Sequence, residues 1–376
     1  MVNKIRLIKL TQKLLSIDSR NPPGDEFKIA NFVSGYLKKI GLKVKVYAFK
    51  RRRLNVLAYL LNKNSAHSLL VTPHLDTVPA GIGWSRSPLR GTLLGGRIYG
   101  LGATDCKGNL ACAMEAINSI IEEKKVLGYN LIFAATADEE CGSGLGLIPL
   151  LDRNLLKADA AVVLDADDFN IIVAQKGLMH LKVKIQGVRA HGAYPWRGEN
   201  AIDAAIDIIK EIRSRKFNFR KNKYLHPPTI NTGTIRGGDK VNIVADWCEF
   251  ELDFRFLPGM FAKALLRELK TVIKKHTKKF KIEVESIQQP YLIRETHPLV
   301  FGLKKAMCSL NREAHLSGSE GATVITFFQH KNIPAVATGF GVNGCAHAKD
   351  EYAQIDNLYK GAQALERFLT SYKIKE

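Results

Sequence analysis

Three short apolar runs in the sequence each end in side chains that can bind a metal ion or carry a proton. The runs are Ser68–Val71, Tyr129–Ala135 and Ala160–Leu164, and each is typical of a buried strand. The polar residues that follow them are His74 and Asp76, then Asp138, Glu139 and Glu140, then Asp165, Asp167 and Asp168. Because open α/β sheets keep their sites at the carboxyl ends of strands, this pattern predicts an α/β fold with its site there.

The first of these strand ends carries an imidazole and a carboxylate two residues apart. In an extended chain, residues i and i+2 point to the same face, so His74 and Asp76 emerge together. A neutral imidazole is a common zinc ligand, and a carboxylate often fixes its tautomer through the second ring nitrogen. We therefore interpret His74 as a ligand and Asp76 as its orienting partner. Taken alone, the pair is also compatible with an ordinary turn.

Two further stretches offer carboxylates. The glycine-rich segment 91–102 leads to Asp105, just before a helix predicted over 109–123. Asp105 is either a plain helix N-cap or a carboxylate able to bridge two metal ions. The adjacent Glu139 and Glu140 cannot both point the same way, so one is expected to bind metal while the other carries protons. An acidic surface turn is the alternative, which the preceding apolar strand disfavours.

The pattern changes in the second half of the chain. Strands are expected over 179–188, 229–236, 247–256 and 280–287, and helices over 201–215 and 261–276. The order β-α-β-β-α-β is the ferredoxin-like arrangement. We therefore expect a catalytic domain over 1–177 and 291–376, with an inserted domain over 178–290. The predicted class is α/β, with a mixed central sheet flanked by helices and a smaller α+β insertion.

Composition narrows the function. No apolar run approaches the length that crosses a bilayer, and the N-terminus lacks a signal-peptide pattern, so we expect a cytoplasmic protein without a membrane partner. None of the six cysteines forms a Cys-x-x-Cys pair, which favours reduced thiols. The net charge of +20 is spread over separate basic runs without a nucleic-acid motif, so a solvated basic surface is favoured over nucleic-acid binding.

Collected, the candidate ligands are His74, Asp105, Glu140, Asp165 and His347. Five nitrogen and oxygen donors without a thiolate fit two zinc ions per subunit, with Co²⁺ or Mn²⁺ as alternatives. One shared carboxylate and two further donors per ion leave room for a bridging water. Such a water has a lowered pKa and attacks a carbonyl at neutral pH. The residue types therefore predict metal-assisted hydrolysis.

Several motifs in this chain resemble those of one family. The sequence is similar to the metal-dependent amidohydrolases and peptidases that include acetylornithine deacetylase, succinyl-diaminopimelate desuccinylase, aminoacylase and glutamate carboxypeptidase. The similarity covers essentially the whole chain, including the insertion. The matching stretches are 74–79, 100–108, 138–140 with Gly142 and Gly144, 187–192 with Pro195, and 346–347 with Glu351.

The resemblance implies a role for each matched residue. One ion would be held by His74, Asp105 and Asp165, and the other by Asp105, Glu140 and His347. Glu139 would take a proton from the bridging water and pass it to the leaving nitrogen. Asp76 would orient His74. On the inserted domain, His191 would stabilise the oxyanion, often from the partner subunit of a dimer. Position alone would favour a surface role for His191.

The same resemblance suggests contacts with substrate. Asn242 and Arg255 match residues that contact substrate, although a salt bridge on the strand face competes for Arg255. The glycine-rich loop 318–321, with Gly318 and Ser319, matches a substrate loop. Two departures stand out. The family most often has Glu-Pro at 165–166, where this chain has Asp-Ala, so Asp167 is an alternative ligand. It usually has Thr-Asp at 319–320, where this chain has Ser-Glu.

We therefore predict a homodimeric hydrolase that cleaves the amide bond of an N-acyl amino acid. Acetylornithine deacetylase and succinyl-diaminopimelate desuccinylase are the leading types. A dipeptidase or carboxypeptidase of the same family is the alternative. A metal- or ligand-binding relative without catalysis is more remote, because a pure binding protein needs no base such as Glu139 beside its metal.

Overall fold

A computed structural model describes residues 1–374, which form two compact units. The first unit contains Met1–Val173, Ile293–Ser317 and the described chain from Phe327 onward. The second unit contains Ala174–Leu292 and Gly318–Thr326. Residues 318–326 fall within the expected second part of the catalytic domain, 291–376, but they pack with the second unit.

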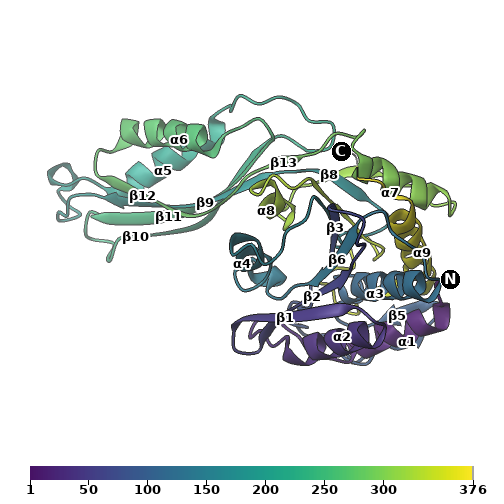
Figure 1. Cartoon of the computed structure of the whole chain (residues 1–376). Coiled ribbons are helices and arrows are strands. Elements are labelled where there is room, and N and C mark those ends of the chain that lie inside the picture. Colours follow the sequence, from purple (N-terminus) through teal and green to yellow (C-terminus); the bar gives the residue numbers. More distant parts are fainter. Residues whose placement is uncertain (375–376) are drawn as a thin grey trace. The chain divides into compact units, whose positions relative to one another are not determined.

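The first unit is built on a mixed sheet (Figure 1). Its strands run in the order β1-β2-β6-β3-β7-β15-β8. The strands β3, β6, β7 and β15 are mutually parallel, and antiparallel pairs flank them at both ends. Their bounds are β1 Lys43–Lys50, β2 Arg53–Leu60, β3 Ser68–Thr72, β6 Asn130–Ala135, β7 Ala160–Val163, β8 Ile171–Gln175 and β15 Ala335–Thr338. The central parallel strands are almost entirely buried, as expected when helices cover both faces.

Helices surround this sheet. They are α1 (Lys4–Leu15), α2 (Phe27–Lys39), α3 (Lys107–Glu122), α4 (Leu147–Asp152), α7 (Pro298–Cys308) and α9 (Ile355–Ser371). Helix α3 packs between α1 and α9. Its own residues are mostly small or apolar on every side, and nearly all of them are buried. Three short strands, β4 (Thr92–Leu94), β5 (Arg97–Tyr99) and β16 (Tyr352–Gln354), form a separate small sheet.

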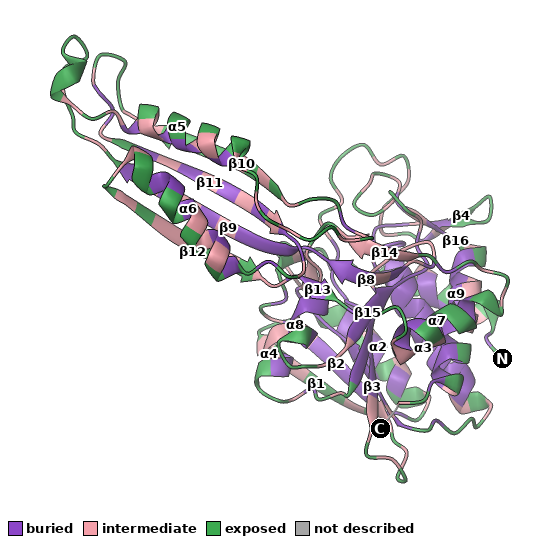
Figure 2. Ribbon diagram, turned by 90° about the horizontal axis from the view of Figure 1, so that it is seen from above, coloured by how far each residue is buried: buried purple, intermediate pink, exposed green. Residues whose placement is uncertain are grey.

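The second unit has the predicted ferredoxin-like arrangement. Its antiparallel sheet has the order β10-β11-β9-β12, formed by β9 (Gly177–Gln186), β10 (Thr229–Gly237), β11 (Trp247–Phe256) and β12 (Phe280–Gln288). Helices α5 (Ala201–Ser214) and α6 (Ala262–His276) pack on one face, and residues along β9 and β11 alternate between buried and partly exposed. Figure 2 shows exposed residues on the outward sides of both helices.

Short elements join the units along the chain. Strand β8 runs from the first unit into the second, and β13 (Tyr291–Leu292) and β14 (Leu316–Ser319) pair with it. Helix α8 (Ile325–Gln329) lies where the chain passes back into the first unit. Single 3-10 turns occur at Glu139–Cys141 and Pro195–Arg197.

The predicted fold class is confirmed, and most expected elements appear within a few residues of their expected bounds. The structure excludes one of the two roles that the sequence leaves open for Asp105. Asp105 is not the N-cap of α3, because that helix begins at Lys107 and Cys106 occupies the cap position without a side-chain hydrogen bond. The carboxylate of Asp105 is therefore not engaged in capping and is free to face other groups.

Candidate metal centre

The carboxyl ends of the parallel strands bring the predicted ligands together. Strands β3, β6 and β7 are parallel neighbours, so the loops that follow them leave the same edge of the sheet. A bridge between His74 and Thr136 extends this alignment past the strand ends. The residues placed at this edge are His74, Asp105, Glu139, Glu140, Asp165 and His347, which fall into groups whose ligand atoms lie within 4.8 Å of one another.

One group is centred on the buried imidazole of His74. Its Nε2 lies 2.9 Å from Oδ1 of Asp105 and 4.0 Å from Oδ1 of Asp165. Glu139 also has a carboxylate oxygen in reach of His74 and Asp165. Of the two candidates Asp165 and Asp167, it is therefore Asp165 that lies in this group. Asp167 belongs to none of the candidate ligand groups among residues 1–374 and instead hydrogen-bonds with Asn170.

The second group is formed by Asp105, Glu140 and His347. His347 Nε2 lies 3.2 Å from Oδ2 of Asp105 and 3.3 Å from Oε2 of Glu140. The two carboxylate oxygens of Asp105 thus face different histidines, which is the position of a bridging ligand. The other oxygen of Glu140, Oε1, is buried without a hydrogen-bond partner. Because a buried carboxylate oxygen is costly to leave unpaired, a cation fits this position.

A third possible group contains Cys106 beside His74 and Asp105. The Sγ atom accepts a hydrogen bond from the main-chain N–H of His74 at 3.2 Å and lies 3.4 Å from its carbonyl oxygen. Burial raises the pKa of the Cys106 thiol to about 12. Since the thiolate is the form that binds metal, Cys106 is best explained as a packed, hydrogen-bonded thiol.

Asp76 is fully buried and supports the site without joining a ligand group. His74 Nδ1 lies 3.0 Å from the main-chain oxygen of Asp76 and 3.5 Å from its carboxylate. The carboxylate itself accepts the main-chain N–H groups of Glu139 at 3.1 Å and Glu140 at 3.2 Å. Asp76 therefore contacts both the imidazole, as expected, and the turn that carries the two glutamates.

The charges of the cluster favour bound cations. Burial, followed by the nearby charge of Asp165, raises the pKa of Glu139 well above its ordinary value. Burial and the charge of Asp105 raise the pKa of Asp165 to about 7. Hydrogen bonds with Asp105 and Glu140 raise the pKa of His347 to about 10. All three shifts mean that the cluster holds protons strongly, and metal ions would take the place of those protons.

Two supporting contacts were not anticipated from the sequence as parts of the site. Glu351 is buried and its carboxylate accepts the main-chain N–H groups of Gly102, Thr104 and Asp105 at 2.8, 2.8 and 3.0 Å. Asn21 donates from its side chain to the carboxylate of Asp76 at 2.9 Å. Glu351 belonged to a matched motif, but nothing in the sequence connects Asn21 with residues so distant along the chain.

The remaining predicted residues belong to the second unit. His191 is exposed and pairs through its main chain with Ile243, and the N–H of Gly192 donates to the carbonyl of Asn242 at 2.8 Å. These two candidates are therefore neighbours. Arg255 forms a paired hydrogen bond with Asp253 at 2.7 and 3.0 Å, the salt bridge that competed with a substrate role.

The glycine-rich loop lies beside a buried lysine. Gly318 approaches the carbonyl of Tyr224 so closely that a Cβ would lie 2.4 Å from its oxygen. The main-chain oxygen of Ser319 accepts the N–H of Lys176 at 3.0 Å. Lys176 Nζ lies 2.5 Å from the carboxylate of Glu320, the residue at which this chain departs from the family pattern. The loop is thus anchored within the second unit.

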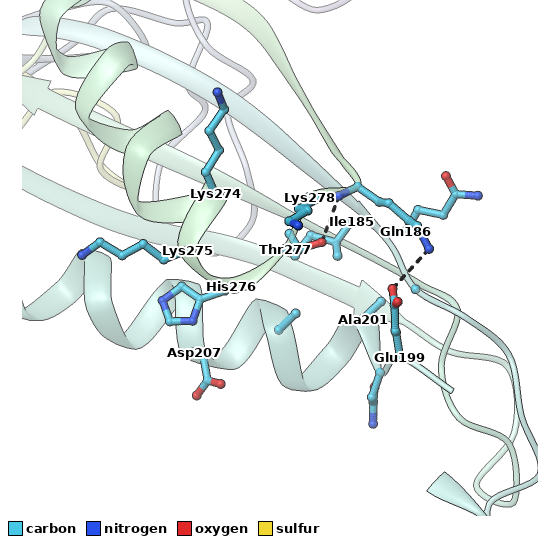
Figure 3. Close-up of a pocket in the computed structure, with 14 residues that line it drawn as sticks. Ile185, Gln186, Glu199, Ala201, Asp207, Lys274, Lys275, His276, Thr277 and Lys278 are labelled. Carbon is cyan, nitrogen blue, oxygen red and sulfur yellow. Dashed lines mark hydrogen bonds and ion pairs between the residues drawn. The ribbon is translucent and has the colours of Figure 1, made fainter. Parts of the chain in front are cut away.

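A pocket of about 570 Å³ in the second unit lacks a comparable set of groups (Figure 3). The side chains of Lys274, Lys275 and Asp207 point in different directions in this view. Lys275 and His276 pair with Glu211 at 2.5 and 2.8 Å. Lys275 and His276 therefore have a partner in Glu211, and the side chains of Lys274, Lys275 and Asp207 do not converge on one point (Figure 3). Among residues 1–374, the metal-ligand groups all lie in the first unit. No helix among those residues is long and apolar enough to cross a membrane.

The fold is a mixed β-sheet with nitrogen and oxygen ligands clustered at the carboxyl ends of its parallel strands, and a glutamate lies beside these ligands. Together with the family match, these features define the chain as a metal-dependent hydrolase. Residues 70–371 match the sequence profile of peptidase family M20/M25/M40. This match covers most of the chain, and the protein belongs to that family. The family expected from the motifs at His74, Asp105 and Glu139 is thereby confirmed.

Solved structures share the fold along nearly the whole chain. Aminopeptidase PepT from Bacillus cereus is 23% identical, with a TM-score of 0.82 and 98% of each chain covered. The M20 family metallo-carboxypeptidase Sso-CP2 from Sulfolobus solfataricus is 21% identical, with a TM-score of 0.76, covering 98% of this chain and 99% of that one. A dinuclear metal-binding M20 peptidase from Bacillus subtilis is 14% identical, with a TM-score of 0.76, covering 98% of this chain and 97% of that one.

Proposed function

We propose that this protein hydrolyses the amide bond of a small substrate with two metal ions held by the first unit. The position of Asp105, whose two oxygens face His74 and His347 separately, is the observation that carries the proposal. His74 and Asp165 complete the ligands of one ion, and Glu140 and His347 complete those of the other. Zinc suits these donors best, with Co²⁺ or Mn²⁺ as alternatives.

When bound, two such ions polarise an amide carbonyl and lower the pKa of an attacking water. Glu139 is the proposed base, because its carboxylate lies beside His74 and Asp165. The group formed by Asp105, Glu140 and His347 is complete without it. Its raised pKa suits a group that takes a proton from water and then holds it for delivery to the leaving nitrogen. Asp76 fixes the backbone of Glu139 and contacts His74, so one carboxylate orients both a ligand and the base.

The proposed substrate is an N-acyl amino acid with a free carboxylate, as for acetylornithine deacetylase or succinyl-diaminopimelate desuccinylase. The net charge of +20 favours attraction of anionic substrates and so leans toward a succinyl group. A short peptide is the second candidate, and the names of the similar structures favour it, since they describe an aminopeptidase, a tripeptidase and a carboxypeptidase. The proposed catalytic and substrate-binding residues of the second unit remain His191, Asn242, Arg255, Gly318 and Ser319.

We further propose that the protein is a cytoplasmic homodimer formed through the second unit. Large apolar side chains are exposed there, including Trp196, Ile235, Val241 and Trp247. The first unit also exposes apolar side chains, such as Phe27 and Phe301, but the two exposed tryptophans, Trp196 and Trp247, both lie on the second unit. Exposed aromatic side chains are typical of protein interfaces. Sedimentation of the purified chain tests this part of the proposal: a species of twice the chain mass is expected, and a monomer at all concentrations would contradict it.

Hydrolysis of a defined substrate panel tests the catalytic proposal. The zinc-loaded protein would be offered N-acetyl-ornithine, N-succinyl-diaminopimelate, dipeptides and tripeptides, with Glu139→Gln as the matched variant. We expect turnover of one class, and a loss of at least about a thousandfold in kcat for the variant while its metal stays bound. Full activity of Glu139→Gln would remove Glu139 as the base. Turnover of peptides alone would favour the second candidate substrate.

A further inference from the structure

Arg53 on β2 lies at the centre of a buried ion network in the first unit. Its side chain is only 7% exposed, and its guanidinium bonds both carboxylate oxygens of Glu26 at 2.7 and 2.9 Å. The same guanidinium donates to Oδ1 of Asp138 at 2.7 Å. Gly24 packs so closely against it that a Cβ there would lie 2.3 Å from Cζ of Arg53. The guanidinium is therefore held in one position by two separate segments of chain, the one that contains Gly24 and Glu26 and the one that contains Asp138.

Asp138 in turn shapes the loop that carries Glu139, the proposed base, and Glu140, a proposed metal ligand. It has a left-handed backbone conformation, with φ of 66°, which is uncommon for a residue with a side chain. Its Oδ2 accepts the N–H of Leu145 at 2.9 Å, and its carbonyl accepts the N–H of Ser143 at 2.5 Å. Glu139 and Glu140 follow directly in a single 3-10 turn. The position of Asp138 thus sets where this turn begins.

A second residue of β2 contacts the same loop. Asn55 is fully buried and two residues from Arg53, so both side chains lie on one face of the strand. Asn55 accepts the N–H of Ala137 at 2.9 Å and donates to the carbonyl of Leu145 at 2.9 Å. Strand β2 therefore holds the loop at both of its ends and, through Arg53, at Asp138.

From the other side, the turn is held by Asp76 and Asn21. Asp76 accepts the N–H groups of Glu139 and Glu140, and Asn21 Nδ2 lies 2.9 Å from Asp76 and 3.2 Å from Asp138. Asn21 thus links the two aspartates that flank the turn. Hydrogen-bonded networks of this kind fix a geometry when every member has a partner.

We propose that Arg53 is a positioning residue, which acts through Asp138 to fix the turn that presents Glu139 and Glu140 to the metal centre. This inference rests on the proposed function of those two glutamates. The competing explanation is that Arg53 merely neutralises the buried carboxylate of Glu26. That task needs only the paired bonds to Glu26, whereas the additional bond to Asp138 ties the guanidinium to the active turn.

The variant Arg53→Lys separates these explanations. Lysine keeps the positive charge beside Glu26 but lacks the planar fork that spans Glu26 and Asp138. The matched control is Arg52→Lys, the same change at the adjacent residue, whose guanidinium pairs with Asp25 on the surface at 2.5 Å. Zn²⁺ titration of the metal-free protein is measured first, followed by kcat and KM on the substrate that the wild-type protein turns over best.

For Arg53→Lys we expect one of the two Zn²⁺ binding steps to weaken by about 10- to 100-fold, because Glu140 is displaced. We also expect kcat to fall by a similar factor while KM changes less than about twofold, because the base moves and the substrate contacts do not. Arg52→Lys should match the wild type. A lower Tm for Arg53→Lys with unchanged zinc binding and unchanged kcat would show a structural role alone and overturn the proposal.

Asp138→Asn approaches the same contact from the other partner and serves if Arg53→Lys fails to fold. It should weaken the same zinc step, although it also changes the contact of Asp138 with Leu145. The double variant should be no worse than Asp138→Asn alone, because Arg53 acts on the turn only through Asp138. Additive losses would overturn the proposal. Zinc binding without turnover in the wild type would contradict the proposed reaction and leave the titration as the test of Arg53. Absence of zinc binding in the wild type would contradict both.

Discussion

At the scale of single residues, the centre depends on side chains that face one another across long stretches of sequence. Asp105 contacts His74 and His347, which precede and follow it by 31 and 242 positions. Each imidazole is a ligand for a different ion in our proposal. Removal of one should therefore abolish one metal site and spare the other.

For His347→Ala we expect the zinc content to fall from about two ions to about one per chain, since Asp105 and Glu140 alone are a poor site. The side chain is 52% exposed, so the fold should be unaffected. Metal analysis after dialysis measures this directly. His315→Ala is the control, because His315 is also exposed, lies in the same unit and belongs to no ligand group among residues 1–374. Retention of both ions by His347→Ala would contradict the ligand assignment.

At the scale of elements, the helices and strands that could be predicted are those with a clear local pattern of apolar and polar residues. Buried strands such as β3 and β6 are apolar runs with polar ends, so both the strands and the donors at their ends are visible in the sequence. The short strands β4 and β5 and the helix α4 were missed, because three to six residues carry too little periodicity.

The supporting contacts of the site were not predictable in the same way. Arg53 and Asn21 are ordinary residues in their local segments, and only the packed fold brings them within hydrogen-bond distance of Asp138. The sequence also left two roles open for Asp105, because a carboxylate before a helix has the same local sequence whether it caps the helix or binds metal. Asp76 could be predicted because it lies two residues from His74, whereas Arg53 and Asn21 have no such local link to the residues that they support.

Close packing at the end of β15 gives a prediction for that element. Gly339 lies against the loop that carries Asp165, and a Cβ would lie 1.6 Å from the carbonyl oxygen of Ala166. Gly339→Ala should therefore push this loop away and reduce the stability by about 1–3 kcal/mol, with weaker zinc binding.

The control for this change is Gly35→Ala in α2, where a Cβ would meet nothing within 4 Å. Alanine in an exposed helix position should leave stability unchanged or raise it by up to about 1 kcal/mol. Thermal unfolding of both variants with and without zinc is the measurement. Equal stability of the Gly339→Ala variant and the wild type would mean that the loop relaxes easily, and would contradict the tight support of Asp165.

At the scale of the whole molecule, the two compact units differ in their expected response to metal. All candidate ligand groups among residues 1–374 lie in the first unit, where Asp105, Glu139, Glu140 and Asp165 bring four carboxyl groups close together. Metal ions would take the place of the protons that this cluster holds, and they need the folded arrangement of its ligands. Metal at about a hundred times its Kd should stabilise that unit by about 2.7 kcal/mol.

Chelation should therefore lower the Tm of the transition that belongs to the first unit and leave that of the second unit unchanged. Differential scanning calorimetry with and without a chelator measures both transitions, and Zn²⁺ added back should restore the original profile. An identical profile in both conditions would show that metal does not bind the folded protein more tightly than the unfolded chain.

The most direct test of the proposed function is zinc content and hydrolysis measured on one purified sample. N-acetyl-ornithine, N-succinyl-diaminopimelate and a small peptide set would be offered to protein supplied with zinc. We expect about two zinc ions per chain and clear turnover of one of these substrates. No tightly bound metal after zinc is supplied would mean that His74, Asp105, Glu140, Asp165 and His347 are not the ligands, and would contradict a two-metal hydrolase.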